Sequence, residues 1–213
     1  QTTMKKLSII VAVYNEENFI SKTIETIAKA NTLKLRREII VIDDGSTDHT
    51  RSRLVNIISE TKRKFKNINF VEIYNDQNFG KGSSVNQGVL KSTGDYVIIQ
   101  DADLEYTPNE YPLLLEPFLE KDADVVFGSR FISDRPHRVL YFWHYVVNTI
   151  LTTFSNMLTN LNLTDMETGY KAFKGDLIRK VAKDLQSARF GFEPEVTARV
   201  ARIKNIKIYE VGI

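Results

Sequence analysis

The chain has 213 residues, 42% of them hydrophobic, with 29 Lys and Arg against 27 Asp and Glu and no Cys. This apolar content supports a full core in one domain and excludes disordered and collagen-like chains. The net charge is only +2 and basic residues are interleaved with acidic ones, so nucleic acid is not expected as a partner. Without Cys there is no disulfide, thiol nucleophile or thiolate metal site, and a cytoplasmic setting fits.

Short apolar runs alternate with segments of helical period, which predicts an α/β domain with a mainly parallel sheet flanked by helices. The first run, 7–13, is interpreted as a buried strand because it leads into Tyr14-Asn15-Glu16-Glu17 and not into a signal-peptide cleavage site. Strands are expected at 7–13, 38–43, 69–74, 96–100, 124–127 and 207–211. Helical faces are expected around 20–27 and 54–58 and over 113–119, 141–161, 177–185 and 194–203. The apolar segment 139–163, interrupted by Asn148 and other polar residues, suits a packed or interfacial helix.

Polar and glycine-rich segments follow five of the predicted strands. In open sheets ligands bind beyond the carboxyl ends of the strands, so these segments are expected to converge on one rim. They are Tyr14-Asn15-Glu16-Glu17, Asp43-Asp44-Gly45-Ser46, the segment from Asp76 to Gly82, Asp101-Ala102-Asp103 and Gly128-Ser129-Arg130.

The Asp101-Ala102-Asp103 motif places two carboxylates at alternate positions, where both can turn to the same edge. Such a pair suits Mg²⁺ or Mn²⁺, which one or two carboxylates commonly hold together with water and substrate phosphates. Glu105 repeats the spacing and is a candidate third ligand. Standing alone, the motif would favour a solvated strand end over a metal site.

The segment from Asp43 to Ser46 offers a carboxylate for a base edge or a ribose hydroxyl, or else a turn with a helix cap. Neither Gly-x-Gly-x-x-Gly after the first strand nor a P-loop signature is present, which disfavours nicotinamide-dinucleotide and P-loop ATPase folds. The segment from Gly80 to Ser84 is interpreted as a flexible basic turn that feeds a helix and closes over a nucleotide, or as an ordinary loop.

Two later segments are also polar. The segment from Thr164 to Lys171 crowds two acids, a glycine and a lysine between helical stretches, which is typical of a functional loop or of a helix-capping loop. The segment from Gly191 to Glu195 is typical of a helix start, with Pro and acids in the first turn. His137 and His144 lie seven positions apart, which disfavours a zinc pair.

Taken in order, these motifs resemble the landmarks of family 2 glycosyltransferases with the GT-A fold. The likeness covers nearly the whole chain. The motif around Gln100 to Glu105, Gly128-Ser129-Arg130-Phe131 and the segment from Asp165 to Phe173 are similar to the dolichol-phosphate mannosyltransferase and polyprenyl-phosphate glycosyltransferase branch. The resemblance implies a single GT-A domain over residues 1–213, an inverting transfer from UDP- or GDP-hexose, and a divalent metal.

The resemblance also implies roles for individual residues. Tyr14 and Glu16 would line the nucleotide pocket, Asp43 would contact the base or ribose, and Lys81 would contact phosphate. The metal would be held by Asp101, Asp103 and Glu105, although mannosyltransferases often have Gln at the last position. The catalytic set would comprise Asp103, Arg130, Asp165 and Glu167, with Arg130 also contacting the donor phosphates.

The acceptor decides whether a base is needed. A lipid phosphate is largely ionised at neutral pH and needs only cations such as Arg138 or Lys171 to hold it, so a protein peripherally associated with a membrane is expected. A sugar hydroxyl would instead need a carboxylate, and Asp165 or Glu167 would serve.

Other classes remain open at this point. One is a family 2 transferase acting on a sugar hydroxyl, and another is a binding module without catalysis. A third is a nucleotidyltransferase, which is disfavoured because no basic glycine-rich loop follows the first strand. Because family members commonly continue past the last predicted strand, we expect that the chain is truncated at its C-terminal end.

Overall fold

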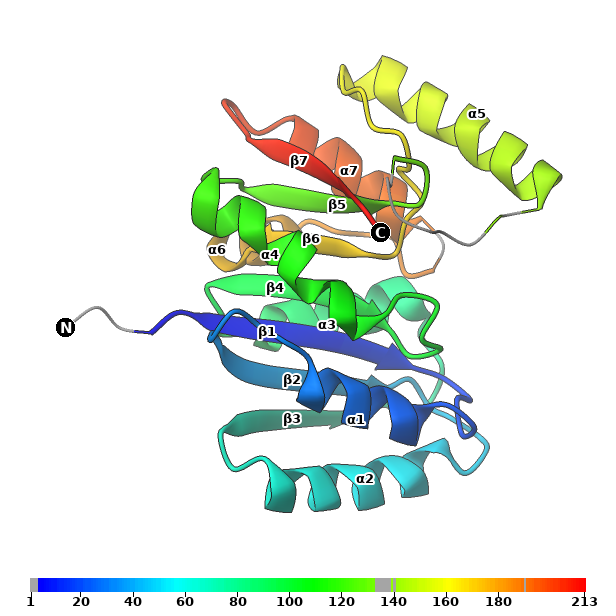
Figure 1. The fold of residues 1–213 in the computed structure, drawn as a ribbon. Coiled ribbons are helices and arrows are strands. Elements are labelled where there is room, and N and C mark those ends of the chain that lie inside the picture. Colours follow the sequence, from blue (N-terminus) through cyan, green and yellow to red (C-terminus); the bar gives the residue numbers. More distant parts are fainter. Residues whose placement is uncertain (1–3, 133–138, 140, 190) are drawn as a thin grey trace.

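Seven strands form one sheet in the order β3-β2-β1-β4-β6-β5-β7 (Figure 1). The computed structural model describes residues 4–132, 139, 141–189 and 191–213. Neighbouring strands are parallel except β6, which runs antiparallel to β4 and β5. The strands are β1 (Lys6–Val13), β2 (Arg36–Asp43), β3 (Ile68–Tyr74), β4 (Tyr96–Asp101), β5 (Val125–Ser129), β6 (Lys171–Lys174) and β7 (Ile208–Gly212).

Helices cover both faces of this sheet. They are α1 (Ile20–Lys29), α2 (Thr50–Lys64), α3 (Lys81–Lys91), α4 (Tyr111–Glu120), α5 (Phe142–Thr159), α6 (Gly175–Ala182) and α7 (Phe192–Ala201), with a 3₁₀ turn at Pro108–Glu110. Among the residues that the structure describes, no helix combines the length and apolar character needed to cross a membrane.

The core lies in two layers, one on each side of the sheet. Because successive side chains of a strand point to opposite faces, Ile9 of β1 enters one layer and Ile10 enters the other. The first layer is completed by buried residues of α1, α2 and α4, and the second by those of α3, α6 and α7. This packing on both faces explains why the strands are near-continuous apolar runs.

Two features differ from the sequence-based expectations. The strand β6 was not predicted, because its residues follow a polar loop and number only four. The segment from Gly80 to Ser84 is not a flexible turn, since Lys81 already begins α3. Its backbone is fixed from outside by the Ser83 amide, which donates to the Ala188 carbonyl at 3.0 Å.

Candidate active site

A cavity of about 340 Å³ opens at the carboxyl ends of β1 and β4. The register pairs Val13 of β1 with Asp43 of β2, and Ala12 of β1 with Asp101 of β4. Because the chain passes from β1 to β2 on one side while β4 lies on the other, the connections diverge here and leave a crevice. The lining residues of this β1–β4 cavity are Ala12, Val13, Tyr14, Glu16, Asp44, Asn78, Gly80, Lys81, Ser84, Asp101, Ala102, Asp103 and Arg189.

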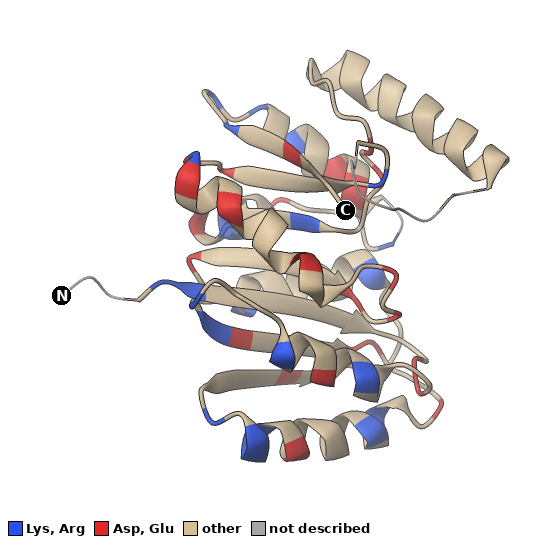
Figure 2. Cartoon of the chain, viewed as in Figure 1, with Lys and Arg blue, Asp and Glu red and all other residues tan. Residues whose placement is uncertain are grey.

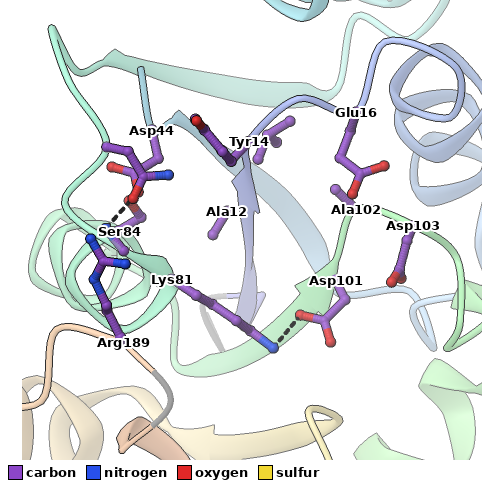
Figure 3. Close-up of a pocket in the computed structure, with 13 residues that line it drawn as sticks. Ala12, Tyr14, Glu16, Asp44, Lys81, Ser84, Asp101, Ala102, Asp103 and Arg189 are labelled. Carbon is purple, nitrogen blue, oxygen red and sulfur yellow. Dashed lines mark hydrogen bonds and ion pairs between the residues drawn. The ribbon is translucent and has the colours of Figure 1, made fainter. Parts of the chain in front are cut away.

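Three carboxylates gather on one side of the β1–β4 cavity. Figure 3 shows Glu16 and Asp103 beside each other, with Asp101 below them at the end of β4. Burial raises the pKa of Glu16, and the nearby charge of Asp103 raises it further. This side therefore holds concentrated negative charge from hard oxygen donors, which favours a divalent cation such as Mg²⁺ or Mn²⁺.

Lys81 faces these acids from the first turn of α3. Its ammonium lies 2.7 Å from Asp101 Oδ1 and 3.4 Å from a carboxylate oxygen of Glu193 in α7. Burial alone would lower the pKa of Lys81, but the charges of Asp101 and Glu193 raise it above its ordinary value. Lys81 therefore keeps its positive charge inside the cavity.

Asp44 holds the loop that leads into α3. Its buried carboxylate accepts hydrogen bonds from the Gly80 amide at 2.8 Å, the Phe79 amide at 3.1 Å and the Asn75 side chain at 2.9 Å. Gly80 has φ of +98° and a side chain there would collide with the Ala188 carbonyl, so this position requires glycine. The loop and the N-terminus of α3 are thereby fixed against the cavity.

Ser84 adds an unused polar group to the same wall. Its side chain is fully buried and lines the cavity, and its Oγ has no hydrogen-bond partner in the part of the chain that the structure describes. Buried hydroxyl groups are normally paired. Ser84 is thus available to a polar group that enters the cavity.

Arg130, just after β5, forms a fork with Asp165. The guanidinium donates from Nε at 2.7 Å and from a terminal nitrogen at 2.9 Å, and the Arg130 amide adds a bond at 3.2 Å. Asn148 of α5 donates to the same carboxylate at 2.8 Å. Burial alone would raise the pKa of Asp165, but the hydrogen bonds and charge of Arg130 hold it below its ordinary value.

The site of Arg130 is connected to the cavity through Tyr106. The ring of Tyr106 stacks on Tyr170, and its hydroxyl accepts a hydrogen bond from the Gly169 amide at 3.2 Å. The charges of Arg130 and Asp101 both act on the Tyr106 hydroxyl. A side chain at Gly169 would approach an Asp101 oxygen to 2.5 Å, so the loop after Asp165 passes directly beside Asp101.

The structure brings several of the predicted site residues into one cavity. Tyr14, Glu16, Lys81, Asp101 and Asp103 all line it. Arg130, Asp165 and Glu167 lie together on the neighbouring loops. The charges of Arg130, Asp165 and Glu193 all act on Glu167, which is half-buried, and burial together with Glu193 raises its pKa.

Like Arg130, Asp165 and Glu167, the predicted nucleotide contact Asp43 and the predicted metal ligand Glu105 lie outside the cavity lining. Asp43 is fully buried, where it accepts a hydrogen bond from Arg51 at 2.6 Å and one from the Ser46 amide at 3.1 Å; its neighbour Asp44 lines the cavity instead. Glu105 is exposed, and its charge acts on Arg130. Within the described residues, no three His, Asp or Glu side chains are grouped in a way that could hold a metal ion.

The expectation that Lys171 holds an acceptor phosphate is wrong. Its side chain is fully buried in β6, and its ammonium donates to the carbonyls of Met166 and Thr168. Burial lowers the pKa of Lys171 to about 8. Arg138, the other cation proposed for this role, lies outside the described residues.

Three residues of the site were not predicted from the sequence. Asp44 stands in the motif that was noticed, but Asp43 was given the role. Glu193 was interpreted only as part of a helix start, and Arg189 was not considered. Figure 3 shows Arg189 on the side of the cavity opposite Asp103. The last two reach the site because the segment before α7 packs on the first turn of α3.

Comparison with known proteins identifies the family. A family model described as glycosyl transferase family 2 matches residues 8–182. The dolichyl-phosphate beta-glucosyltransferase of Dictyostelium discoideum is 28% identical over 226 residues, which cover 97% of this chain and 65% of that protein. The undecaprenyl-phosphate 4-deoxy-4-formamido-L-arabinose transferase of Pectobacterium carotovorum is 33% identical over 124 residues, covering 58% of this chain and 36% of the relative. The chain thus spans 65% or less of these relatives' length.

Solved structures agree on the fold. Glucosyl-3-phosphoglycerate synthase from Mycobacterium tuberculosis, in complex with Mn²⁺, uridine diphosphate and phosphoglyceric acid, superposes with a TM-score of 0.69 at 20% identity, over 98% of this chain and 68% of that one. Staphylococcus aureus TarS superposes with a TM-score of 0.61 at 22% identity, over 97% of this chain and 58% of that one. The GT-A fold and the resemblance to polyprenyl-phosphate transferases are confirmed. The chain belongs to glycosyl transferase family 2.

Proposed function

We propose that this chain is the catalytic domain of an inverting glycosyltransferase that moves a hexose from UDP- or GDP-hexose to a polyprenyl phosphate. The observation that carries the proposal is the division of charge in the β1–β4 cavity. Glu16, Asp101 and Asp103 lie on one side, Arg189 lies on the opposite side, and Lys81 reaches across to Asp101 (Figure 3). A nucleoside diphosphate with a divalent cation matches this division.

The fit to a metal is supported by the donor chemistry. Asp101 and Asp103 supply hard oxygen ligands, and the pKa of Glu16 is raised by burial and then by the nearby charges of Asp103, Asp48 and Asp101. These two residues would hold Mg²⁺ or Mn²⁺ against the donor diphosphate, as Mn²⁺ accompanies UDP in the mycobacterial synthase. The bound cation would offset the negative charge that develops on the leaving nucleoside diphosphate.

The chain's own residues perform the remaining tasks. Lys81 is held by Asp101 and Glu193 in a position where it can move onto a phosphate oxygen as charge develops there, which stabilises the transition state more than the ground state. The free hydroxyl of Ser84 and the backbone fixed by Asp44 would bind the nucleoside.

Arg130 is proposed to bind the acceptor phosphate. Asp165 and Asn148 fix its guanidinium, whose side chain remains 26% exposed. Because a phosphate monoester is already largely ionised at neutral pH, its oxygen attacks the anomeric carbon without a base. The hydrogen bonding of Asp165 supports a phosphate as the substrate that receives the hexose. Its carboxylate already accepts four hydrogen bonds and is poorly suited to remove a proton from a hydroxyl.

The test is a transfer assay with the purified protein. UDP-glucose, UDP-galactose and GDP-mannose are each supplied with Mg²⁺ or Mn²⁺ and, in separate reactions, a short, water-soluble prenyl phosphate or a sugar with free hydroxyl groups. We expect a prenyl-phosphate hexose from at least one donor, and none after Asp103→Asn. Transfer to sugar hydroxyls but to no phosphate would refute the proposed acceptor.

A hydroxyl acceptor is the second candidate, and one observation favours it. Burial and the charge of Glu193 raise the pKa of Glu167, which is the shift expected of a general base near neutral pH. Glu167→Gln separates the two candidates. The variant retains most activity if the acceptor is a phosphate, and it loses about two orders of magnitude if Glu167 removes a proton.

A further inference from the structure

The helix α5 turns its polar side toward the protein. Its two buried residues are Asn148 and Thr152. Asn148 donates to Asp165, and Thr152 accepts a hydrogen bond from the Met166 amide at 3.1 Å. Farther along, the Asn156 side chain exchanges two hydrogen bonds with the backbone of Leu163. The helix is therefore attached to the loop of Asp165 by polar contacts.

The outward side of α5 is apolar. Side chains spaced by three and four positions lie on one face of a helix, and seven exposed apolar side chains follow this spacing. Their exposed fractions range from 44% at Leu151 to 85% at Leu158. We call these residues the outer face of α5: Trp143, Val147, Ile150, Leu151, Phe154, Met157 and Leu158.

This face lacks charge over its whole length. From Val139 to Thr164 the sequence contains no Asp, Glu, Lys or Arg. Figure 2 shows α5 without a charged residue, while most other helices carry several, and Figure 1 shows it at the margin of the molecule beyond β5 and β7. An exposed apolar surface of this extent is typical of a membrane or protein contact.

Two observations favour a lipid bilayer as the occupant. Aromatic side chains, which concentrate at the headgroup level of membranes, crowd the start of the helix: Tyr141, Phe142, Trp143 and Tyr145 are all exposed. On its polar side, α5 also contacts Asp165 through Asn148, and Asp165 in turn accepts hydrogen bonds from Arg130. A surface on this helix thus lies beside the residue proposed to bind the phosphate of a lipid.

We propose that the outer face of α5 lies in the interface of a lipid bilayer and so holds Arg130 at the membrane surface, where the phosphate of a polyprenyl acceptor is found. The part concerning the acceptor rests on the proposed function. Bilayer contact itself is measurable without donor or acceptor.

Trp143 provides a direct probe because it is the chain's one tryptophan and is 71% exposed. Vesicles of phosphatidylcholine, with or without phosphatidylglycerol, are added to the protein. We expect Trp143 emission to shift to shorter wavelength and to be quenched by brominated lipid. Because the face has no charge, both vesicle types should bind, with little loss at high salt.

The paired variant Ile150→Glu with Phe154→Glu tests the face. Vesicle binding should fall at least about tenfold, because each substitution replaces an apolar side chain that the bilayer would bury with a charged one. The matched control is Val55→Glu with Leu90→Glu, which introduces the same two charges on α2 and α3. Both of these apolar side chains are also exposed, at 47% each. The control should bind vesicles as the unmodified protein does, and circular dichroism verifies that both variants are folded.

Transfer activity separates this proposal from the proposed function. The α5 variant should lose transfer to a long-chain acceptor in vesicles but keep transfer to the water-soluble prenyl phosphate. Transfer to the water-soluble prenyl phosphate, with no change in Trp143 emission when vesicles are added, would overturn the membrane proposal alone. A dimer in light scattering that the α5 variant abolishes would also overturn it, by assigning the face to a second copy. Vesicle binding without transfer to any acceptor would instead refute only the proposed function.

Discussion

Asp165→Asn is expected to destabilise the protein because it breaks a buried ion pair on one side only. Asp165 is fully buried and accepts three hydrogen bonds from Arg130 and one from Asn148. Asparagine would present an NH₂ group to one of these donors and remove the charge that compensates the guanidinium. Loss of one partner of a buried pair costs about 3–5 kcal/mol. Since the Arg130 side chain is 26% exposed and can gain water, we expect the lower end, about 3 kcal/mol.

The assay is thermal and urea unfolding of both proteins. For a chain of this size, about 3 kcal/mol lowers Tm by roughly 6–12 °C. The control is Asp176→Asn, because Asp176 also pairs with an arginine at 2.7 Å but is 91% exposed; no measurable change is expected. An unchanged Tm for Asp165→Asn would refute the view that this pair organises the loop.

The pH dependence of that difference has a definite sign. Because the pKa of Asp165 is held below its ordinary value, the pair stabilises the protein above about pH 4 and ceases to do so as the pH falls through the folded-state pKa. The difference between the two proteins should therefore shrink in acid.

The remaining predictions concern Glu193, Lys171 and Gly80. Glu193→Gln should weaken Mn²⁺ binding about fivefold, or about 1 kcal/mol, because Lys81 then pairs more fully with Asp101. Calorimetry measures this change, with Glu120→Gln as the control variant. Equal Mn²⁺ affinities of Glu193→Gln and the unmodified protein would contradict the prediction. In the unmodified protein, Lys171 makes the free energy of unfolding rise with pH between about 8 and 10.5, because in this range the unfolded chain binds more protons than the folded one. Lys171→Met should remove this rise. Urea unfolding should show the unmodified protein gaining up to about 3 kcal/mol on the variant across this range, and parallel pH curves would contradict it. Gly80→Ala should lower Tm and donor affinity together, because its left-handed backbone and the Ala188 contact both resist a side chain; an unaltered Tm would count against this.

Much of the sheet could be predicted because its strands are buried on both faces and read as apolar runs. The predicted strand 7–13 matches β1 within one residue. The strand β6 escaped prediction because four residues carry no readable period, and its Lys171 was interpreted as accessible to solvent. Lys171 shares a face of β6 with Phe173, which lies in the second core layer, and only the tertiary structure reveals that this face is buried.

The site was predictable where its residues directly follow strands. Asp101 and Asp103 belong to one short motif at the end of β4, so local sequence was enough to bring them together. Lys81 and Glu193 are more than a hundred positions apart in the chain, and no local pattern links them. Asp43 binds Arg51 and is therefore turned away from the cavity, whereas Asp44 lines it. The sequence alone does not show which of two adjacent aspartates faces the cavity.

Titration calorimetry with Mn²⁺ and a UDP- or GDP-sugar most directly tests whether the β1–β4 cavity is a donor site. The account predicts that the unmodified protein binds at least one of these nucleotides only when the cation is present, and that Asp103→Asn abolishes this binding without lowering Tm. Equal binding by the two proteins, or no nucleotide binding under any condition, would contradict it.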